Sequence, residues 1–350
     1  MRAVTFPGDR QIAFVEFPDP TPDANEVVLE MKASGVCGSD LHYYRRPTGT
    51  PMSAKFQYEK GPVIGGHEPC GVVAAIGPGV PQAVARLGDR VMVHHYSACG
   101  ACNLCRSGWQ QLCQEVPVKT YGNNGHGCHA PYFKVPAITL VPLPDELSFA
   151  TGAATSCGTG TAYGALRRLN LTGNDTIAIF GQGPVGLSGT QLAKAMGAKV
   201  IAVEVSAERL ERAKPFGPDA TINSSVDDAI SAIKDLTHGY GVDLSLDCSG
   251  SAAGRIAAIR CLKVWGKACF VGEGGKLEVD VSPDLLRRQI TVMGSWTFST
   301  VIQSECAQFV ADRKIDVDAI FTNRWRLDQA DEAYKLVDKQ TSGKAVFLFE

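Results

Sequence analysis

Apolar and polar positions follow two different patterns along the chain, and the pattern changes between residues 150 and 176. Up to about residue 150, short alternating runs such as Glu26–Met31 and Gly71–Ile76 are separated by turn residues, in a stretch rich in Val, Gly and Pro. Short alternating runs with turns between them are typical of β-rich structure. We therefore expect an all-β unit here, with the N-terminal segment Met1–Pro7 as its first strand.

From Thr176 onward, short apolar runs alternate with segments of helical pattern. Strands are expected at Thr176–Phe180, Val200–Glu204, Asp243–Asp247, Ala268–Val271 and Ile290–Met293, and helices at about Val185–Met196 and Ala207–Lys214. Strands that alternate with helices predict a parallel sheet covered on both faces. After about residue 297 the pattern becomes mixed, and the strand-like run Ala345–Phe349 closes the chain.

Composition narrows the class of protein. A chain of 350 residues, 45% apolar and 20% charged, is long enough for two domains with substantial cores. The net charge of −2 gives no reason to expect nucleic acid or an anionic membrane as partner. The longest apolar runs stop well before bilayer length, and the N-terminus lacks the apolar core of a signal peptide. Twelve cysteines in such a chain favour metal binding or free thiols over disulfides, and a reducing cytoplasm as the compartment.

Four of these cysteines form a compact cluster in the sequence. Cys99, Cys102 and Cys105 make two overlapping C-x-x-C steps, and Cys113 follows after seven residues. Four thiolates at this spacing suit a closed tetrahedral zinc site. Because no ligand position is left for water, we expect this zinc to be structural.

A glycine-rich loop stands between a predicted strand and a predicted helix. Its sequence, Gly181-Gln-Gly183-Pro184-Val185-Gly186, fits the dinucleotide fingerprint, in which the glycines permit a tight turn and a close approach of the pyrophosphate. Glu204 ends the next strand, where a carboxylate accepts hydrogen bonds from the adenosine ribose and repels a 2′-phosphate. NAD is therefore favoured over NADP, although the nearby cation Arg209 opposes this preference.

A second set of zinc-type ligands, Cys37, His67, Glu68 and Cys157, lies outside the cysteine cluster. Gly66-His67-Glu68-Pro-Cys-Gly71, then Gly77 and Val80, matches at every fixed position the zinc-site signature of zinc-dependent alcohol dehydrogenases, a family of the medium-chain dehydrogenase/reductase superfamily. Cys37-Gly-Ser39-Asp40-Leu-His42 and Ser156-Cys157-Gly-Thr-Gly-Thr161 resemble the segments that carry the family's first and third protein ligands. The resemblance covers essentially the whole chain.

The resemblance implies a fold and a set of roles. The fold is α/β: a GroES-like β-rich catalytic domain, residues 1–158 and 297–350, with a Rossmann doubly wound parallel-sheet domain inserted at residues 159–296. Two zinc ions are implied, a structural one and a catalytic one on Cys37, His67 and Cys157 with an open fourth position. For proton transfer, the resemblance implies that Ser39 accepts the substrate proton and that His42 is the outer end of the proton relay. It also implies that Asp40 is the partner of His67 and that Glu68 transiently replaces water at zinc. For the cofactor, it implies a nicotinamide contact by Thr161, a pyrophosphate contact by Lys344, and further contacts by Val271 and Ser295. Solvent-exposed side chains without such a role remain the alternative for His42 and Lys344.

The chain departs from the family pattern in three places. Cys157 stands where polyol dehydrogenases often have glutamate, which argues against a typical sorbitol enzyme. The segment 43–60 is longer than expected and contains Arg45 and Arg46, which either form part of a pocket rim for an acidic substrate or belong to a solvated loop. His95 lies near the position where the resemblance implies a pocket side chain, and His126 and His129, in a segment expected to be more apolar, either tune the pocket or its entrance or are structural.

These observations predict a zinc- and NAD-dependent dehydrogenase that interconverts alcohols, secondary or medium-sized ones, and their ketones or aldehydes in a cleft between the two domains. We expect a homotetramer or homodimer, from the resemblance alone. Three alternatives stay open: a polyol or sugar dehydrogenase with the same chemistry, a zinc-free reductase of the superfamily, and a non-catalytic nucleotide-binding protein.

Overall fold

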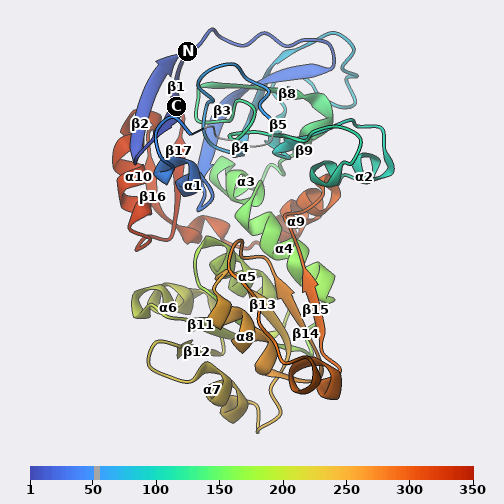
Figure 1. The fold of residues 1–350 in the computed structure, drawn as a ribbon. Coiled ribbons are helices and arrows are strands. Elements are labelled where there is room, and N and C mark those ends of the chain that lie inside the picture. Colours follow the sequence, from blue (N-terminus) through green and yellow to red (C-terminus); the bar gives the residue numbers. More distant parts are fainter. Residues whose placement is uncertain (51–55) are drawn as a thin grey trace. The chain divides into compact units, whose positions relative to one another are not determined.

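The computed structural model of the protein describes residues 1–50 and 56–350 and contains two compact units (Figure 1). The first unit comprises Met1–Cys157 and Ser299–Glu350, and the second comprises Gly158–Phe298. Among the helices of the described residues, none has both the length and the apolar character needed to cross a bilayer.

The first unit is mainly β-structure. Its strands are β1 (Arg2–Gly8), β2 (Gln11–Glu16), β3 (Glu26–Val36), β4 (Glu68–Ile76), β5 (Arg90–Val93), β6 (Tyr96–Ser97), β7 (Lys119–Thr120), β8 (Tyr132–Pro136), β9 (Leu140–Pro142), β16 (Phe321–Trp325) and β17 (Lys344–Leu348). Its helices are α1 (Asp40–Arg45), α2 (Asn103–Arg106), α3 (Phe149–Thr155), α9 (Thr300–Asp312) and α10 (Ala330–Asp338).

A seven-stranded sheet organises this unit. Its order is β16-β17-β3-β4-β5-β9, and β8 pairs with β3 beside this path. The long strand β3 is central and lies antiparallel to β17, β4 and β8. Its residues Val27, Leu29 and Met31 alternate along the strand and are buried in one core cluster, as the period of two requires for a strand with a buried face. The sheet thereby brings the starts of β4 and β17 close to the end of β3, and candidate site residues stand at or next to these three points.

The second unit contains strands and helices in alternation. The strands are β10 (Thr176–Phe180), β11 (Lys199–Glu204), β12 (Ala220–Asn223), β13 (Val242–Asp247), β14 (Leu262–Phe270) and β15 (Thr291–Gly294), and the helices are α4 (Gly158–Leu169), α5 (Pro184–Ala195), α6 (Ala207–Ala213), α7 (Ala229–Leu236) and α8 (Ala252–Arg260). Ser206, Asp228 and Ser251 cap α6, α7 and α8 by accepting hydrogen bonds from main-chain N–H groups three residues on.

All six strands of the second unit are parallel, in the order β12-β11-β10-β13-β14-β15. Numbered from β10, this is the order 3-2-1-4-5-6 of a doubly wound dinucleotide-binding sheet, and the order reverses between β10 and β13. Ligands of such sheets bind outside the carboxyl ends of the strands at this reversal. The predicted fold class, a β-rich GroES-like domain with a Rossmann domain, is confirmed.

The structure also contains elements that the sequence patterns do not predict. Residues 43–45 of the expected loop belong to α1, whose Tyr44 is buried. Part of the predicted 43–60 loop, residues 51–55, lies outside the described residues. Helices α3 and α4 are almost entirely buried, so they show no polar stripe in the sequence from which a helix is predicted.

Candidate metal centres and cofactor loop

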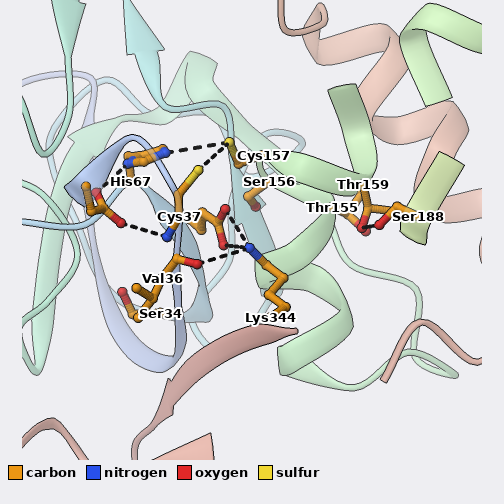
Figure 2. Close-up of polar contacts among 12 residues, drawn as sticks. Ser34, Val36, Cys37, His67, Thr155, Ser156, Cys157, Thr159, Ser188 and Lys344 are labelled. Atoms are coloured by element: carbon orange, nitrogen blue, oxygen red, sulfur yellow. Dashed lines mark hydrogen bonds and ion pairs between the residues drawn. The ribbon is translucent and has the colours of Figure 1, made fainter. Parts of the chain in front are cut away.

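The first candidate metal centre begins where β3 ends. Cys37 directly follows this strand, and its main-chain N–H donates a 2.8 Å hydrogen bond to Oδ2 of Asp40 at the start of α1. His67 directly precedes β4, which pairs with β3, and Cys157 follows α3. Figure 2 shows the side chains of Cys37, His67 and Cys157 pointing toward one another.

The distances between these ligand atoms fit a zinc ion. The sulfurs of Cys37 and Cys157 are 3.9 Å apart, and Nε2 of His67 lies 3.6 Å from the Cys157 sulfur. A tetrahedral zinc with ordinary bond lengths places two sulfur ligands about 3.8 Å apart, and a sulfur and a nitrogen ligand about 3.6 Å apart. These three ligands are one fewer than a closed tetrahedral site needs, and a carboxylate oxygen of Glu68 lies within 4.8 Å of their ligand atoms.

Asp40 orients the imidazole of His67. Oδ1 of this fully buried carboxylate lies 3.0 Å from Nδ1 of His67, so Nε2 faces the two sulfurs. Burial alone lowers the pKa of His67, but the charges of Asp40 and Cys37 outweigh it and raise this pKa well above its usual value. A cation that binds at Nε2 displaces the proton held there, because the ligand form of histidine is the neutral imidazole.

The two cysteines of this centre share a proton. The hydrogen bond from Cys157 holds the pKa of the Cys37 thiol well below its usual value, and the same bond raises the pKa of Cys157. A metal ion replaces the shared proton, which makes its affinity for this centre dependent on pH.

Glu68 is held beside the centre by Lys344. The ammonium group of Lys344 lies 2.6 and 2.8 Å from the two carboxylate oxygens and 3.4 Å from the carbonyl oxygen of Val36. Figure 2 shows the side chain of Lys344 directed toward Val36. Both side chains of the pair are fully buried, and burial raises the pKa of Glu68 to about 7. In this unit the ammonium group of Lys344 is paired with a carboxylate, and its expected contact with the cofactor pyrophosphate stays a prediction.

The second candidate metal centre is the four-cysteine cluster. The sulfur of Cys99 lies 3.7 Å from that of Cys105 and 3.6 Å from that of Cys113, close to the roughly 3.8 Å expected for thiolates on one zinc. Main-chain N–H groups point at the sulfurs: that of Cys102 donates to Cys99 at 3.4 Å. A hydrogen bond from the Cys99 backbone lowers the pKa of Cys113 to about 6, so this thiol ionises readily. All twelve cysteines are free thiols, which leaves these sulfurs available to a metal.

The glycine-rich loop connects β10 to α5 at the carboxyl end of the sheet. Gly181 has a φ of +86°, and a Cβ atom at position 186 would lie 1.7 Å from the carbonyl oxygen of Gly181. Gly183 is the N-cap of α5 with open space around it, and Pro184 follows at the first helical position. The loop thus places a helix N-terminus at the carboxyl end of the sheet, a site suited to a pyrophosphate.

Glu204 is anchored to this loop. Its carboxylate accepts hydrogen bonds from the main-chain N–H groups of Gln182 (2.7 Å), Val205 (2.9 Å) and Ser206 (3.2 Å). Arg209 approaches the same carboxylate to 3.7 Å. A negative charge therefore stands at the end of β11, partly offset by one cation.

The remaining predicted residues lie as follows. Ser39 is 3.2 Å from Nε2 of His67 through its hydroxyl, and His42 is exposed on α1 with its ring against Tyr43. In the second unit Thr161 is buried on α4, and Val271 and Ser295 follow β14 and β15 at the carboxyl end of the sheet. Of the two arginines proposed for an acidic substrate, Arg45 binds Asp338 at 2.5 Å and Arg46 binds the carbonyl oxygen of Phe6 at 2.7 Å, which are structural contacts.

The structure also places the three unassigned histidines. His95 donates from Nδ1 to the carbonyl oxygen of Ser156 at 2.9 Å, and its ring lies 5.1 Å from that of His67. His126 contacts Glu59 at 3.5 Å near the surface. His129 is fully buried beneath the turn that precedes His67. The sequence indicated His126 and His129 only as polar residues in a segment expected to be apolar, and His95 only by its place in the family pattern. No local pattern links Lys344 to Glu68 across 276 positions.

Comparison with known proteins agrees with this geometry. Residues 23–145 match a family profile described as the alcohol dehydrogenase GroES-like domain, and residues 184–313 match one described as zinc-binding dehydrogenase. The uncharacterized zinc-type alcohol dehydrogenase-like protein YphC of Escherichia coli (strain K12) is 40% identical over 100% of this chain and 99% of that protein. The chain belongs to the zinc-type alcohol dehydrogenase family.

Other members and structures of this family are similar over more than nine tenths of their length. The sorbitol dehydrogenase of Bacillus subtilis (strain 168) is 31% identical, over 95% of this chain and 92% of that protein. The solved structure of alcohol dehydrogenase TADH from Thermus sp. ATN1 superimposes with a TM-score of 0.89 at 27% identity, and the match covers 100% of both chains. The fold and the oxidoreductase class of the chain follow from this membership.

Proposed function

We propose that the protein is a zinc-dependent dehydrogenase that transfers a hydride between an alcohol and NAD. One observation carries this proposal: two sulfurs and one imidazole nitrogen lie 3.9 and 3.6 Å apart at the spacing of zinc ligands, with the Ser39 hydroxyl 3.2 Å from that nitrogen. When bound, the zinc would supply a Lewis acid for the substrate oxygen and the nicotinamide a hydride acceptor.

The residues of the first unit perform the proton chemistry. Asp40 fixes the ring of His67 and the main chain of Cys37, so that both ligands keep their positions when the substrate changes charge. The hydroxyl of Ser39, next to the ligand set, takes the proton of the alcohol. The imidazole of His42, exposed on α1, then passes this proton to solvent.

NAD is the proposed cofactor, and two zinc ions per subunit are proposed. Glu204 supports the choice of NAD because a buried carboxylate at the end of β11 repels a 2′-phosphate, and the nearby cation Arg209 lies 3.7 Å from this carboxylate. The four-cysteine cluster supports the second zinc, with no position left for water.

A polyol is the second candidate substrate. It is favoured by the similarity to the sorbitol dehydrogenase of Bacillus subtilis, whereas the cysteine ligand Cys157 favours a simple alcohol. Both candidates use the same ligand set and the same proton acceptor.

The test is a substrate panel for zinc-loaded protein. Reduction of NAD and of NADP is followed by nicotinamide absorbance with primary alcohols, secondary alcohols, polyols and hydroxy acids. We expect turnover with secondary or medium-sized alcohols and a preference for NAD. Absence of turnover across the panel, with zinc and NADH both bound, would contradict the proposal, and turnover of polyols alone would favour the second candidate.

We further propose a homodimer or homotetramer. The edge strand β15 is mostly exposed, and on the neighbouring strand β14 Val264 and Trp265 are 54% and 71% exposed. An unpaired edge flanked by exposed apolar side chains is a surface that proteins cover. Sedimentation velocity at micromolar concentration tests this, and a monomer would contradict it.

Because all twelve cysteines are free thiols, we place the protein in a reducing compartment such as the cytoplasm.

A further inference from the structure

His129 belongs to a segment that runs alongside the turn preceding His67. Main-chain hydrogen bonds of 2.8, 3.1 and 2.9 Å join residues 127, 128 and 129 to residues 64, 66 and 65. The main-chain carbonyl of His129 accepts a further bond from Val4 of β1 at 3.0 Å. The position of this segment is therefore coupled directly to the turn from which the imidazole ligand of the metal centre projects.

Both ring nitrogens of His129 are hydrogen-bonded in a fully buried site. Nδ1 lies 2.7 Å from the hydroxyl of Ser34 on β3, and Nε2 lies 2.7 Å from the hydroxyl of Tyr334 on α10. The Ser34 hydroxyl is also 3.0 Å from the sulfur of Cys128. One direction of bonding satisfies every strong donor: Tyr334 donates to Nε2, Nδ1–H donates to Ser34, and Ser34 donates to the Cys128 sulfur.

The imidazole of His129 also fills the space beside Gly66. Gly66 has a φ of +82°, and a Cβ atom at this position would lie 2.3 Å from Nδ1 of His129. The ring thus lies against the main chain of the residue immediately before His67. A shift of the ring moves this turn, and a shift of the turn changes where Nε2 of His67 stands relative to the two sulfurs.

The other surroundings of His129 are aromatic. Its ring centre lies 4.9 Å from that of Phe347 and 6.4 Å from that of Phe6, both in edge contacts. A phenylalanine would suit such a core without the cost of burying two polar nitrogens. Unlike a phenylalanine, the histidine has a fixed ring orientation, because its two short hydrogen bonds hold the ring between β3 and α10.

We propose that His129 is a positioning residue of the metal centre: its bonds to Ser34 and Tyr334 hold the turn before His67, and thereby set the affinity of Cys37, His67 and Cys157 for their cation. This inference rests on the zinc centre of the proposed function. It assigns a role to a histidine of the segment Gly-His-Gly-Cys-His-Ala that the catalytic chemistry leaves unused.

The test compares the two zinc sites of one molecule. Full-length zinc-loaded protein is titrated with a competing chelator, and the four-cysteine site serves as an internal control. In His129→Phe we expect the zinc affinity of the site formed by Cys37, His67 and Cys157 to fall about 10- to 100-fold. This is the usual effect of removing a group that holds a metal ligand in place. The zinc affinity of the four-cysteine site stays unchanged. Tyr334→Phe, which removes one bond and keeps the ring, gives a smaller loss at the same site.

Phe347→Leu is the matched control, because it removes an apolar contact with the same ring. It lowers the thermal midpoint and leaves both zinc affinities as in the wild type. If His129→Phe and Tyr334→Phe behave like this control, with only the midpoint lowered, His129 is a core residue and the inference is overturned; should His129→Phe not fold, Tyr334→Phe decides alone. Wild-type protein that binds one zinc would overturn the proposed metal centre itself, and this inference with it.

Discussion

At the scale of single residues, the pair Glu68–Lys344 links the candidate metal centre to the C-terminal strand. Both side chains are almost completely buried, so each charge depends on the other for its stabilisation. The ligand residues are predictable from the sequence because they stand in a short signature, as His67 and Glu68 do. The partner of Glu68 is not, because the pairing of β17 with β3 brings it in from the far end of the chain.

Replacement of Lys344 by methionine leaves the Glu68 carboxylate without its cation. We expect the free energy of unfolding, measured by urea denaturation, to fall by about 3–5 kcal/mol, the usual result of breaking a buried ion pair on one side. The double variant Lys344→Met with Glu68→Gln recovers much of this loss, since no buried charge is left unpaired. A single variant as stable as the wild type would show that the pair does not exist in solution.

At the scale of elements, the turn between β10 and α5 shows how much local sequence decides. The strand, the glycine pattern and the helix are all predictable, because a short apolar run, three glycines and a helical period stand in order. Helices α3 and α4 are not predictable from the sequence, because they are almost entirely buried and lack a polar stripe. Helix α4 also contains three glycines. The edge strand β12, of four residues, is too short for a period to be recognised.

Two glycines of this turn have separable functions. Gly183 has open space around it, so Gly183→Ala leaves stability within about 0.5 kcal/mol of the wild type. Its new methyl group stands where the pyrophosphate approaches the helix N-terminus, and NADH affinity falls at least about tenfold. Gly186→Ala, by contrast, collides with the carbonyl of Gly181 and costs about 1–3 kcal/mol of stability.

Fluorescence titration with NADH and thermal melting separate these two effects. Gly183→Ala protein that binds NADH as tightly as the wild type would contradict the assignment of the turn as the cofactor site.

At the scale of the whole molecule, the metal ligands and the dinucleotide turn belong to different compact units. Both candidate metal centres lie in the unit of Met1–Cys157 and Ser299–Glu350, and the turn with Glu204 lies in the unit of Gly158–Phe298. The fold class of each unit is predictable from the change of hydrophobic pattern between residues 150 and 176. The return of the chain to the first unit after Phe298 is predictable only through the family resemblance, because the pattern there is mixed.

The division into units predicts that loss of the four-cysteine zinc spares cofactor binding. Cys105→Ser removes a ligand of the closed site, so the protein loses one zinc and its thermal midpoint falls, because a structural zinc contributes to folding free energy. NADH affinity stays within about twofold of the wild type, since the dinucleotide turn and the four-cysteine cluster belong to different compact units. Metal analysis, melting and NADH titration of the same sample check this, and an unchanged zinc content and midpoint would refute the structural site.

The most direct test of the account is the alcohol-dependent reduction of NAD by zinc-loaded wild-type protein and by Cys157→Ser, measured side by side with NADH binding. The account predicts turnover in the wild type, and in the variant a loss of at least about a thousandfold, because one of three ligands of the catalytic cation is gone while the cofactor turn is intact. NADH binding by the variant stays as in the wild type. A variant that retains wild-type turnover would contradict the central claim that Cys37, His67 and Cys157 hold the catalytic zinc.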